Sequence, residues 1–141
     1  MNGTTYDEIW EMFIPVCGYN TKDLPKTDAL RYSFIRQSIV KYNSLVNKYE
    51  GRFTEKVKCD DDMEELNFKL KDIELQILVY LMSSIFSAYK LSEFSSIYGV
   101  FAKELGIKEY NGQISARNGR VEYFEEQAIS LIEDDITTFD L

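Results

Sequence analysis

The acidic run Asp60-Asp61-Asp62, followed by Glu64 and Glu65, is the densest group of potential metal ligands in the sequence. Carboxylate oxygens are the ligands that Ca²⁺ prefers in proteins. A calcium-binding EF-hand loop, however, needs oxygen ligands at alternating positions, a central glycine and a glutamate at its twelfth position. The run does not match this full pattern. We therefore interpret it as a solvated acidic turn and predict no metal site.

Other residue types that can do chemistry lack the neighbours that they need. Glu125-Glu126 and the acids at 133–135 are paired carboxylates, but general acid–base catalysis needs one carboxyl group with a pKa raised by burial, and here we expect solvent. Cys17 and Cys59 have no histidine to activate them, because the sequence contains none, and they form no CxxC pair. We interpret both as small buried residues. The sequence predicts no catalytic residues, no cofactor and no enzymatic activity.

The composition predicts one mostly α-helical domain over residues 1–141, a small bundle of about four to five helices. Apolar residues make up 45% of the chain and charged residues 28%, as in an ordinary globular domain. With only two prolines and seven glycines, few positions force a chain break. The N-terminus lacks the basic segment and apolar run of a signal peptide, and the apolar stretch at 77–86 is too short to span a bilayer. We expect a soluble cytosolic protein.

Apolar spacing predicts where the first helices lie. A helix over 6–14 should end at Pro15, and the stretch 17–25 should be a loop. A second helix should begin with Thr27 as its N-cap and end at Gly51. These segments form the N-terminal part of the domain, residues 1–60.

The next part of the chain contains the predicted core. Residues 52–71 favour a short strand or extended segment, a polar turn and one helical turn. A helix from Asp72 is apolar almost all round over 73–89, which is typical of a central buried helix, and 91–105 continues it or follows a bend.

Residues 106–120 carry three of the seven glycines and two asparagines, so we predict a long loop or a β-hairpin between the last two long helices. A final helix should follow over 120–136. Loops between rigid helices often bind partners, and Arg and Tyr are favoured at interfaces. The alternative is an ordinary exposed loop. The predicted interface residues are Lys108, Tyr110, Ile114, Arg117 and Arg120.

The formal net charge of −8 is concentrated at the C-terminal end. From Glu122 onward the chain has seven acidic residues and no basic one. Such a surface repels nucleic acid. It is either a solvated helix face or a surface that lies near DNA without holding it. The acids nearest the C-terminus are Glu133, Asp134, Asp135 and Asp140.

The run from Leu70 to Met82, LKDIELQILVYLM, resembles the start of the central helix in small head-to-tail connector (adaptor) proteins of tailed phages from Gram-positive bacteria. There, a leucine, a capping Ser or Thr, Asp and Glu open a helix that ends in a Met-containing apolar stretch; here Lys71 replaces the capping hydroxyl. The resemblance to these connector proteins continues beyond this helix. It includes the run 101–110, a polar loop with Gln113 and Ser115, and a closing helix. The resemblance covers residues 66–136.

The resemblance implies a structural virion protein of the neck, made in the host cytoplasm and free of cofactor and membrane. A ring of about twelve copies would dock under the portal protein and extend the DNA channel toward the next neck or tail-terminator protein. The loop at 106–120 would contact the portal or a neighbouring copy. The acids Glu133, Asp134, Asp135 and Asp140 would face the channel or a partner, and DNA would slide past them without specific binding. The alternative function is an acidic helical regulatory or inhibitor protein that binds a host protein.

Overall fold

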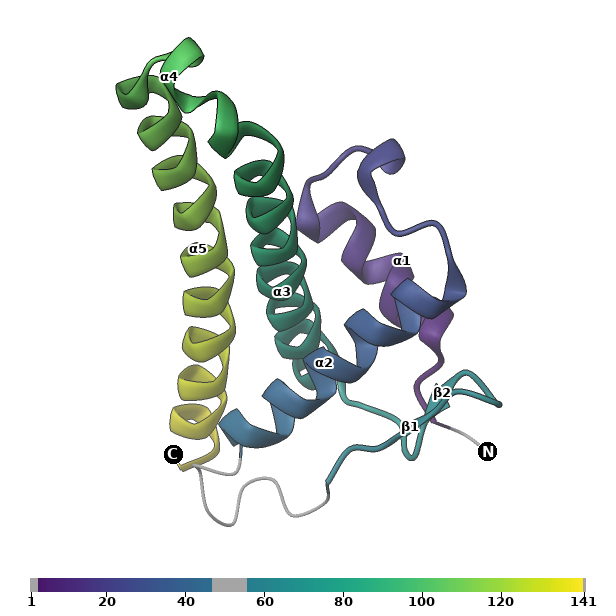
Figure 1. Ribbon diagram of the computed structural model, residues 1–141. Coiled ribbons are helices and arrows are strands. Elements are labelled where there is room, and N and C mark those ends of the chain that lie inside the picture. The colour runs from purple at the N-terminus through teal and green to yellow at the C-terminus, as the bar shows by residue number, and fades with distance from the viewer. Residues whose placement is uncertain (1–2, 47–55, 141) are drawn as a thin grey trace.

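The computed structural model describes residues 3–46 and 56–140, and their side chains except those of residues 101, 103, 105 and 135–140. This part of the chain confirms a small, mostly α-helical bundle, and it also contains a short β-hairpin before the central helix (Figure 1). The helices are α1 (Tyr6–Cys17), α2 (Asp28–Val46), α3 (Asp72–Tyr98), α4 (Ala102–Leu105) and α5 (Ile107–Asp140). The strands are β1 (Cys59–Asp60) and β2 (Glu65–Leu66), and two 3₁₀ turns are η1 (Thr21–Asp23) and η2 (Gly99–Phe101).

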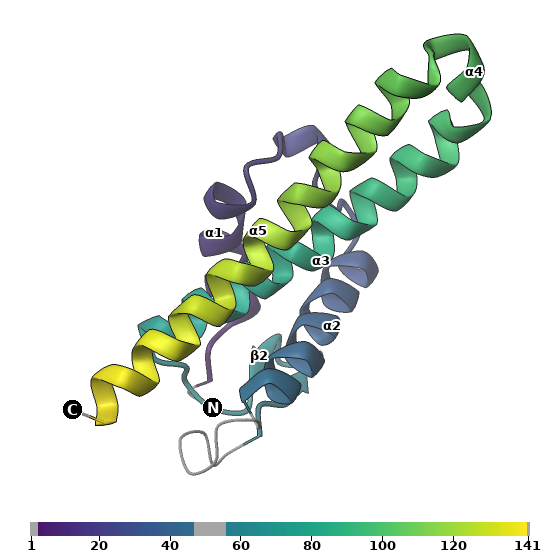
Figure 2. The ribbon, with the colours of Figure 1, turned by 90° about the vertical axis from the view of Figure 1, so that its left-hand side faces the viewer.

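Helix α3 is the central element, as its apolar sequence predicts. It begins at Asp72, where the Glu74 side chain accepts a hydrogen bond of 2.8 Å from the backbone N–H of Lys71. It runs antiparallel to α5 and packs with α1 and α2 on its other side (Figures 1 and 2). Its buried residues include Ile77, Leu78, Val79, Leu81, Met82 and Phe86. The segment after residue 90 continues α3 to Tyr98 before the chain turns through η2 and α4.

Helix α3 has 27 residues, longer than the apolar stretch picked out from the sequence. Within the described residues it is the one helix whose length and composition would suffice to cross a membrane, with a mean hydropathy of 1.2 over its most apolar window. The bundle buries 56% of that window. A helix at the centre of a soluble bundle has the same composition.

Helix α1 does not end at Pro15, contrary to the prediction, but continues to Cys17. Pro15 is exposed and lies in the last turn, where losing one backbone hydrogen bond costs less than in a helix interior. The buried Cys17 keeps this turn packed on the core. Gly18 ends the helix because its φ of 74° is a left-handed conformation that glycine adopts without strain.

Helix α2 begins as predicted, with the Thr27 hydroxyl accepting a hydrogen bond of 3.3 Å from the backbone N–H of Leu30. It is described as far as Val46, and the predicted terminator Gly51 lies outside the described residues. The buried Asn43 binds both backbone groups of Val57, at 2.9 Å and 3.1 Å, and so fixes the segment that leads into β1.

The stretch before α3 forms an antiparallel hairpin in which Cys59 pairs with Leu66. From residue 56 onward the predicted strand or extended segment and the polar turn are confirmed, whereas residues 52–55 of that prediction lie outside the described residues. The predicted helical turn within 63–70 is wrong, because this stretch pairs with the start of the chain instead. The backbone of Thr4 bonds to Leu66 and Phe68, and its hydroxyl accepts a hydrogen bond of 2.8 Å from the N–H of Leu70.

The predicted loop or hairpin at 106–120 is wrong, since α5 is helical from Ile107 onward. Tertiary packing overrides the low helix propensity of Gly and Asn here. Gly112 and Gly119 lie on the open side of the helix, where an added Cβ would meet no atom within 4 Å. The residues that turn toward the rest of the bundle recur every three or four positions: Tyr110, Ile114, Arg117, Val121, Phe124 and Ala128.

Candidate functional site

The hairpin of α3 and α5 projects beyond α1 and α2 and ends in the turn through η2 and α4 (Figures 1 and 2). Several large apolar side chains gather on this turn and are exposed to solvent. Ile97 is 56% exposed, Val100 79% and Ile107 61%. We call these three residues and the exposed Tyr98 the hairpin tip. Exposed large apolar residues at a projecting turn are typical of surfaces that bind other proteins.

An aromatic cluster supports the hairpin tip from below. The Phe94 ring lies 4.9 Å from the Tyr98 ring and stacks at 6.0 Å on the Tyr110 ring, centroid to centroid. The Arg117 guanidinium lies over Phe94 at 4.1 Å, and the hydroxyl groups of Tyr110 and Ser95 are hydrogen-bonded at 3.2 Å. These contacts join α3 to α5, so the tip is carried on a fixed support.

The predicted interface residues are spread along α5 rather than gathered in a loop. Tyr110 and Arg117 contact α3, and Arg120 binds the end of α1 with a hydrogen bond of 2.9 Å to the carbonyl oxygen of Cys17. Ile114 is half-buried against α3, and Lys108 is exposed near the tip. Four of the five thus pack against other parts of the chain, and a role in binding a partner stays a prediction for all five.

Sequence reasoning missed the apolar residues of the hairpin tip. They lie around Gly99 and Gly106, two breaks that mark a turn between helices. An apolar residue beside such a break does not belong to the regular apolar face of either helix. This position outside the pattern was the signal that could have identified the tip residues from the sequence.

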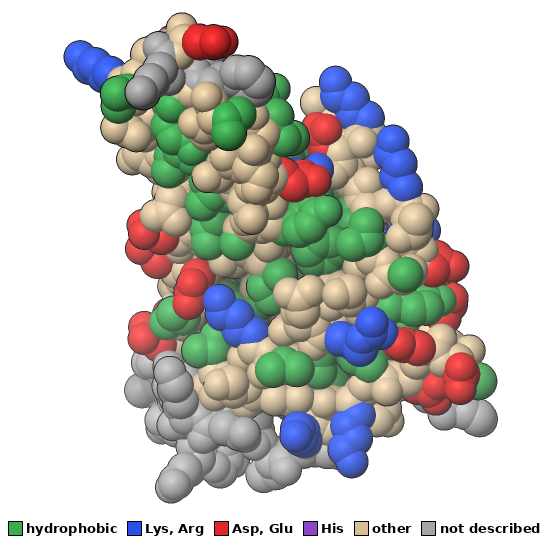
Figure 3. Space-filling view, viewed as in Figure 1, with side chains coloured by type: hydrophobic (Ala, Val, Ile, Leu, Met, Phe, Trp, Pro, Cys, Tyr) green, Lys and Arg blue, Asp and Glu red, His purple; other side chains and the backbone are tan. Residues whose placement is uncertain are grey.

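The predicted acidic residues belong to the C-terminal half of α5. Glu133 and Asp134 are exposed, whereas the side chains of Asp135 and Asp140 lie outside the described residues. Glu125 forms an ion pair of 3.4 Å with Lys41 of α2. Acidic groups follow the edge that α5 forms in Figure 3. Their position near DNA or a partner stays a prediction.

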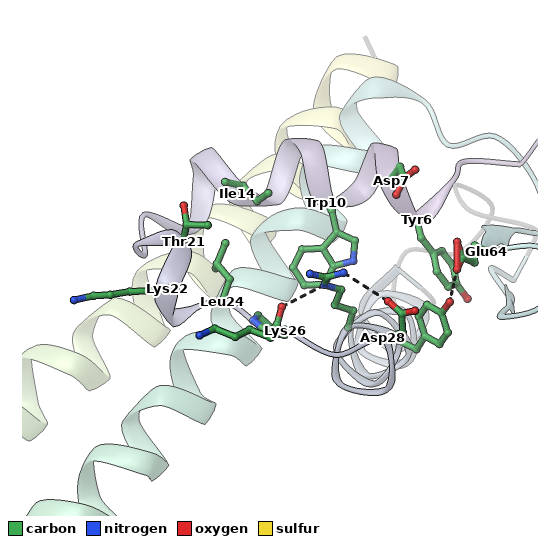
Figure 4. A pocket seen from close by; sticks show the side chains of 13 residues that line it. Tyr6, Asp7, Trp10, Ile14, Thr21, Lys22, Leu24, Lys26, Asp28 and Glu64 are labelled. Carbon is green, nitrogen blue, oxygen red and sulfur yellow. Dashed lines mark hydrogen bonds and ion pairs between the residues drawn. The ribbon is translucent and has the colours of Figure 1, made fainter.

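A pocket of about 480 Å³ lies between α1 and the segment that leads into α2 (Figure 4). We call it the Trp10 pocket. Trp10, Ile14 and Leu24 form an apolar middle. The two lysines and the acidic side chains lie at opposite ends (Figure 4), whereas Arg31 also lines the pocket and is paired with Asp28. The basic end has Lys22 and Lys26, and the acidic end has Asp7, Asp28 and Glu64.

Contacts among its own residues hold the walls of the Trp10 pocket. Arg31 donates a hydrogen bond of 3.2 Å to the carbonyl oxygen of Pro25 and pairs with Asp28 at 3.6 Å. The Tyr32 hydroxyl donates to the Glu64 carboxylate. The backbone N–H of Tyr6 donates to the carbonyl oxygen of Glu64 at 2.9 Å, which holds Glu64 at its positive φ of 54°. The pocket is therefore preformed.

The acidic run and the cysteines form no visible reactive centre. Asp61 binds the Tyr6 hydroxyl at 2.6 Å and pairs with Arg36, while Asp60 accepts two backbone hydrogen bonds within its turn. Burial raises the pKa of both thiols, Cys17 and Cys59. In the ranges 3–46 and 56–140 no three His, Cys, Asp or Glu side chains are placed to hold a metal ion.

Comparison with known proteins gives the chain a family. It matches the family described as YomZ prophage protein over residues 1–136. Over 113 residues it is 29% identical to the SPbeta prophage-derived protein YomZ of Bacillus subtilis strain 168, an alignment that covers 80% of this chain and 81% of that one. No solved structure matches it. The family match spans nearly the whole sequence, and the protein therefore belongs to the YomZ prophage protein family.

Proposed function

We propose that the protein is a structural subunit of a phage particle, a head-tail connector in the neck, that works by protein–protein contact. The observation that carries the proposal is the hairpin tip, an exposed apolar surface on a rigid helical support in a chain of a prophage protein family. Exposed apolar surface costs solubility, so it is typical of chains that bury it in an assembly.

The charge distribution supports a place beside DNA. The exposed acids of α5, such as Glu122, Glu126 and Glu133, give one side of the molecule a negative potential. In a ring under the portal, this side would line the channel. DNA is then repelled from the wall and passes without being held.

The test is to purify phage particles from an induced lysogen and quantify the protein relative to the portal protein. We expect a fixed ratio close to one copy per portal subunit. Particles that lack the protein, while it stays soluble in the lysate, would contradict the proposal.

A variant pair ties the result to the hairpin tip. Val100→Asp places a charge at the most exposed tip residue and should reduce incorporation into particles several-fold. Val40→Asp places the same charge on the exposed face of α2, away from the tip, and should leave incorporation unchanged. Equal incorporation of both variants would show that the hairpin tip takes no part in the contact that incorporates the protein into particles.

The acidic side of α5 favours a second candidate, a regulatory protein that binds a host protein. The variant in which Glu133, Asp134, Asp135 and Asp140 become Gln or Asn removes four charges without deleting the helix. If this candidate holds, the variant should lose a host protein that the immobilised wild type retains at low salt. Unchanged retention would exclude it, since charge pairing is strongest at low salt.

A further inference from the structure

We propose that the hairpin tip of one copy docks into the Trp10 pocket of a second copy. The inference rests on the proposed function in that it takes the tip as a contact surface, and it names the partner of that surface. The tip is an apolar projection and the Trp10 pocket is an apolar hollow, and both belong to the same chain. A projection that fits a pocket elsewhere on the same molecule produces head-to-tail association.

The hairpin tip has the exposure that an anchor needs. Val100 and Ile107 stand on the two sides of the short α4 and are among the most exposed large apolar residues of the described chain. Phe94, Tyr98, Tyr110 and Arg117 pack together beneath them, so docking would not have to order the hairpin first. A preformed anchor loses little conformational entropy on binding.

The Trp10 pocket has the size and lining that an apolar anchor needs. Its volume of about 480 Å³ holds more than one aliphatic side chain and lies within the usual range of binding pockets, about 300–1,000 Å³. Ile14 is 45% exposed and Trp10 is half-buried, so apolar surface at the middle of the pocket remains open to a partner. Buried Trp side chains are frequent centres of binding energy.

Charge favours this pairing. Around the tip, Glu104, Lys108 and Glu109 are exposed, and Figure 3 shows a basic and an acidic group on different sides of the projecting end. In the Trp10 pocket Lys22 and Lys26 lie at one end and the acids at the other, and Arg31 is already paired with Asp28. An apolar anchor flanked by both signs can thus enter with each sign opposite its complement.

The two surfaces share no residue, so each copy can use both at once. Contacts of this kind do not stop at two copies, but continue into a closed ring or an open chain. Trp10 is the sole tryptophan of the sequence, and its fluorescence therefore reports directly on the pocket.

Sedimentation and tryptophan fluorescence of the full chain, over a concentration series up to about 1 mM, test the inference. We expect the mean mass to rise with concentration, with a blue shift of Trp10 emission in the same range because the second copy excludes water from the indole. A protein that stays monomeric throughout, or that associates without a change in Trp10 emission, would overturn the proposal.

Complementation between two variants tests the head-to-tail geometry. Val100→Asp disrupts the tip and leaves the pocket intact, whereas Ile14→Lys disrupts the pocket and leaves the tip intact. Each alone should weaken association at least tenfold, and the matched controls Val40→Asp and Val40→Lys should not. An equal mixture of the two variants should form dimers and nothing larger, since one intact tip and one intact pocket remain. Variants that associate like the wild type would refute the contact.

The outcome is separable from that of the proposed function. A protein that is present in particles but shows no tip-dependent association in solution overturns this inference and leaves the connector proposal in place. A protein that associates through tip and pocket but is absent from particles overturns the connector proposal and leaves this inference in place.

Discussion

The Arg120 side chain of α5 donates a hydrogen bond from Nη2 to the backbone carbonyl oxygen of Cys17, 2.9 Å away, at the end of α1. Its guanidinium also lies 4.2 Å from the centre of the Tyr19 ring. A cation at a helix C-terminus pairs with carbonyl groups that have no partner inside the helix. One residue thus ties the first helix to the last.

Replacing Arg120 with Met should lower the free energy of unfolding by about 1–2 kcal/mol, because the variant loses a charged hydrogen bond and the contact with Tyr19. Urea unfolding measures the change. Lys108→Met, at an exposed site of the same helix, is the control and should stay within about 0.5 kcal/mol of the wild type. Equal losses in both variants would show that the contact with α1 adds nothing.

Alanine at Gly112 or Gly119 should raise the free energy of unfolding by about 0.5–1 kcal/mol each. Both positions lie within α5, and an added Cβ meets no neighbour. Gly106→Ala should destabilise instead, because Gly106 has a φ of 92°. Thermal unfolding of the three variants checks this. Destabilisation at Gly112 would support a turn there and contradict a continuous helix.

The variant Asn43→Ala should lose about 2–3 kcal/mol of stability, because the Asn43 side chain satisfies both the N–H and the C=O of the buried Val57. Val57 is only 2% exposed, so the loss includes the desolvation of both backbone groups. Chemical unfolding gives the value. The matched change Asn118→Ala removes an exposed amide that bonds within α5 and should be nearly neutral.

Two tyrosines should make the protein sensitive to alkali. Burial and the hydrogen bond to Asp61 raise the pKa of Tyr6, and the hydrogen bond to Glu64 raises the pKa of Tyr32 to about 12. Unfolded tyrosine ionises near pH 10, so the folded state holds protons that the unfolded state loses. The stabilisation is complete below about pH 10 and disappears as the pH rises through the folded values.

Urea unfolding between about pH 9 and 12 should therefore show a fall in stability that is shallower in Tyr6→Phe and Tyr32→Phe. Absorbance titration of tyrosinate in the folded protein gives a second measurement, in which both groups should ionise later than ordinary tyrosine. Tyr123, which is exposed, provides a comparison through Tyr123→Phe. If removing Tyr6 or Tyr32 leaves the titration curve and the slope unchanged, the hydrogen bonds to the carboxylates do not perturb these groups.

The sequence was a good guide wherever a helix has strong local signals. The apolar run after Asp72 and the hydroxyl of Thr27 placed two helix starts correctly, because burial and capping act within a few residues. It failed at Pro15 and over 106–120, where breaker residues lie on helices that distant contacts hold. The regular recurrence of Tyr110, Ile114 and Arg117 indicated a helix, and the glycines beside them hid it.

The Trp10 pocket could not be predicted from the sequence. Its walls come from α1, from the segment into α2 and from the turn at Glu64, which are far apart along the chain. Only the packed core brings these three segments together, and no local sequence pattern indicates that they are close in the folded protein. The contacts that the predicted interface residues make within the chain could not be predicted for the same reason, because Arg120 meets Cys17 across 103 positions of sequence.

The order of α3 and α5 along the chain has a consequence for biosynthesis. The ribosome releases α3 well before α5, so the face of α3 that carries Tyr80, Ser84 and Phe94 emerges without the helix that covers it. Nascent chains with uncovered apolar faces are bound by chaperones. A ribosome that stalls within α5 therefore yields a product in which the side of α3 that packs on α5 stays exposed to solvent. Quality-control proteases should remove this product faster than the finished protein.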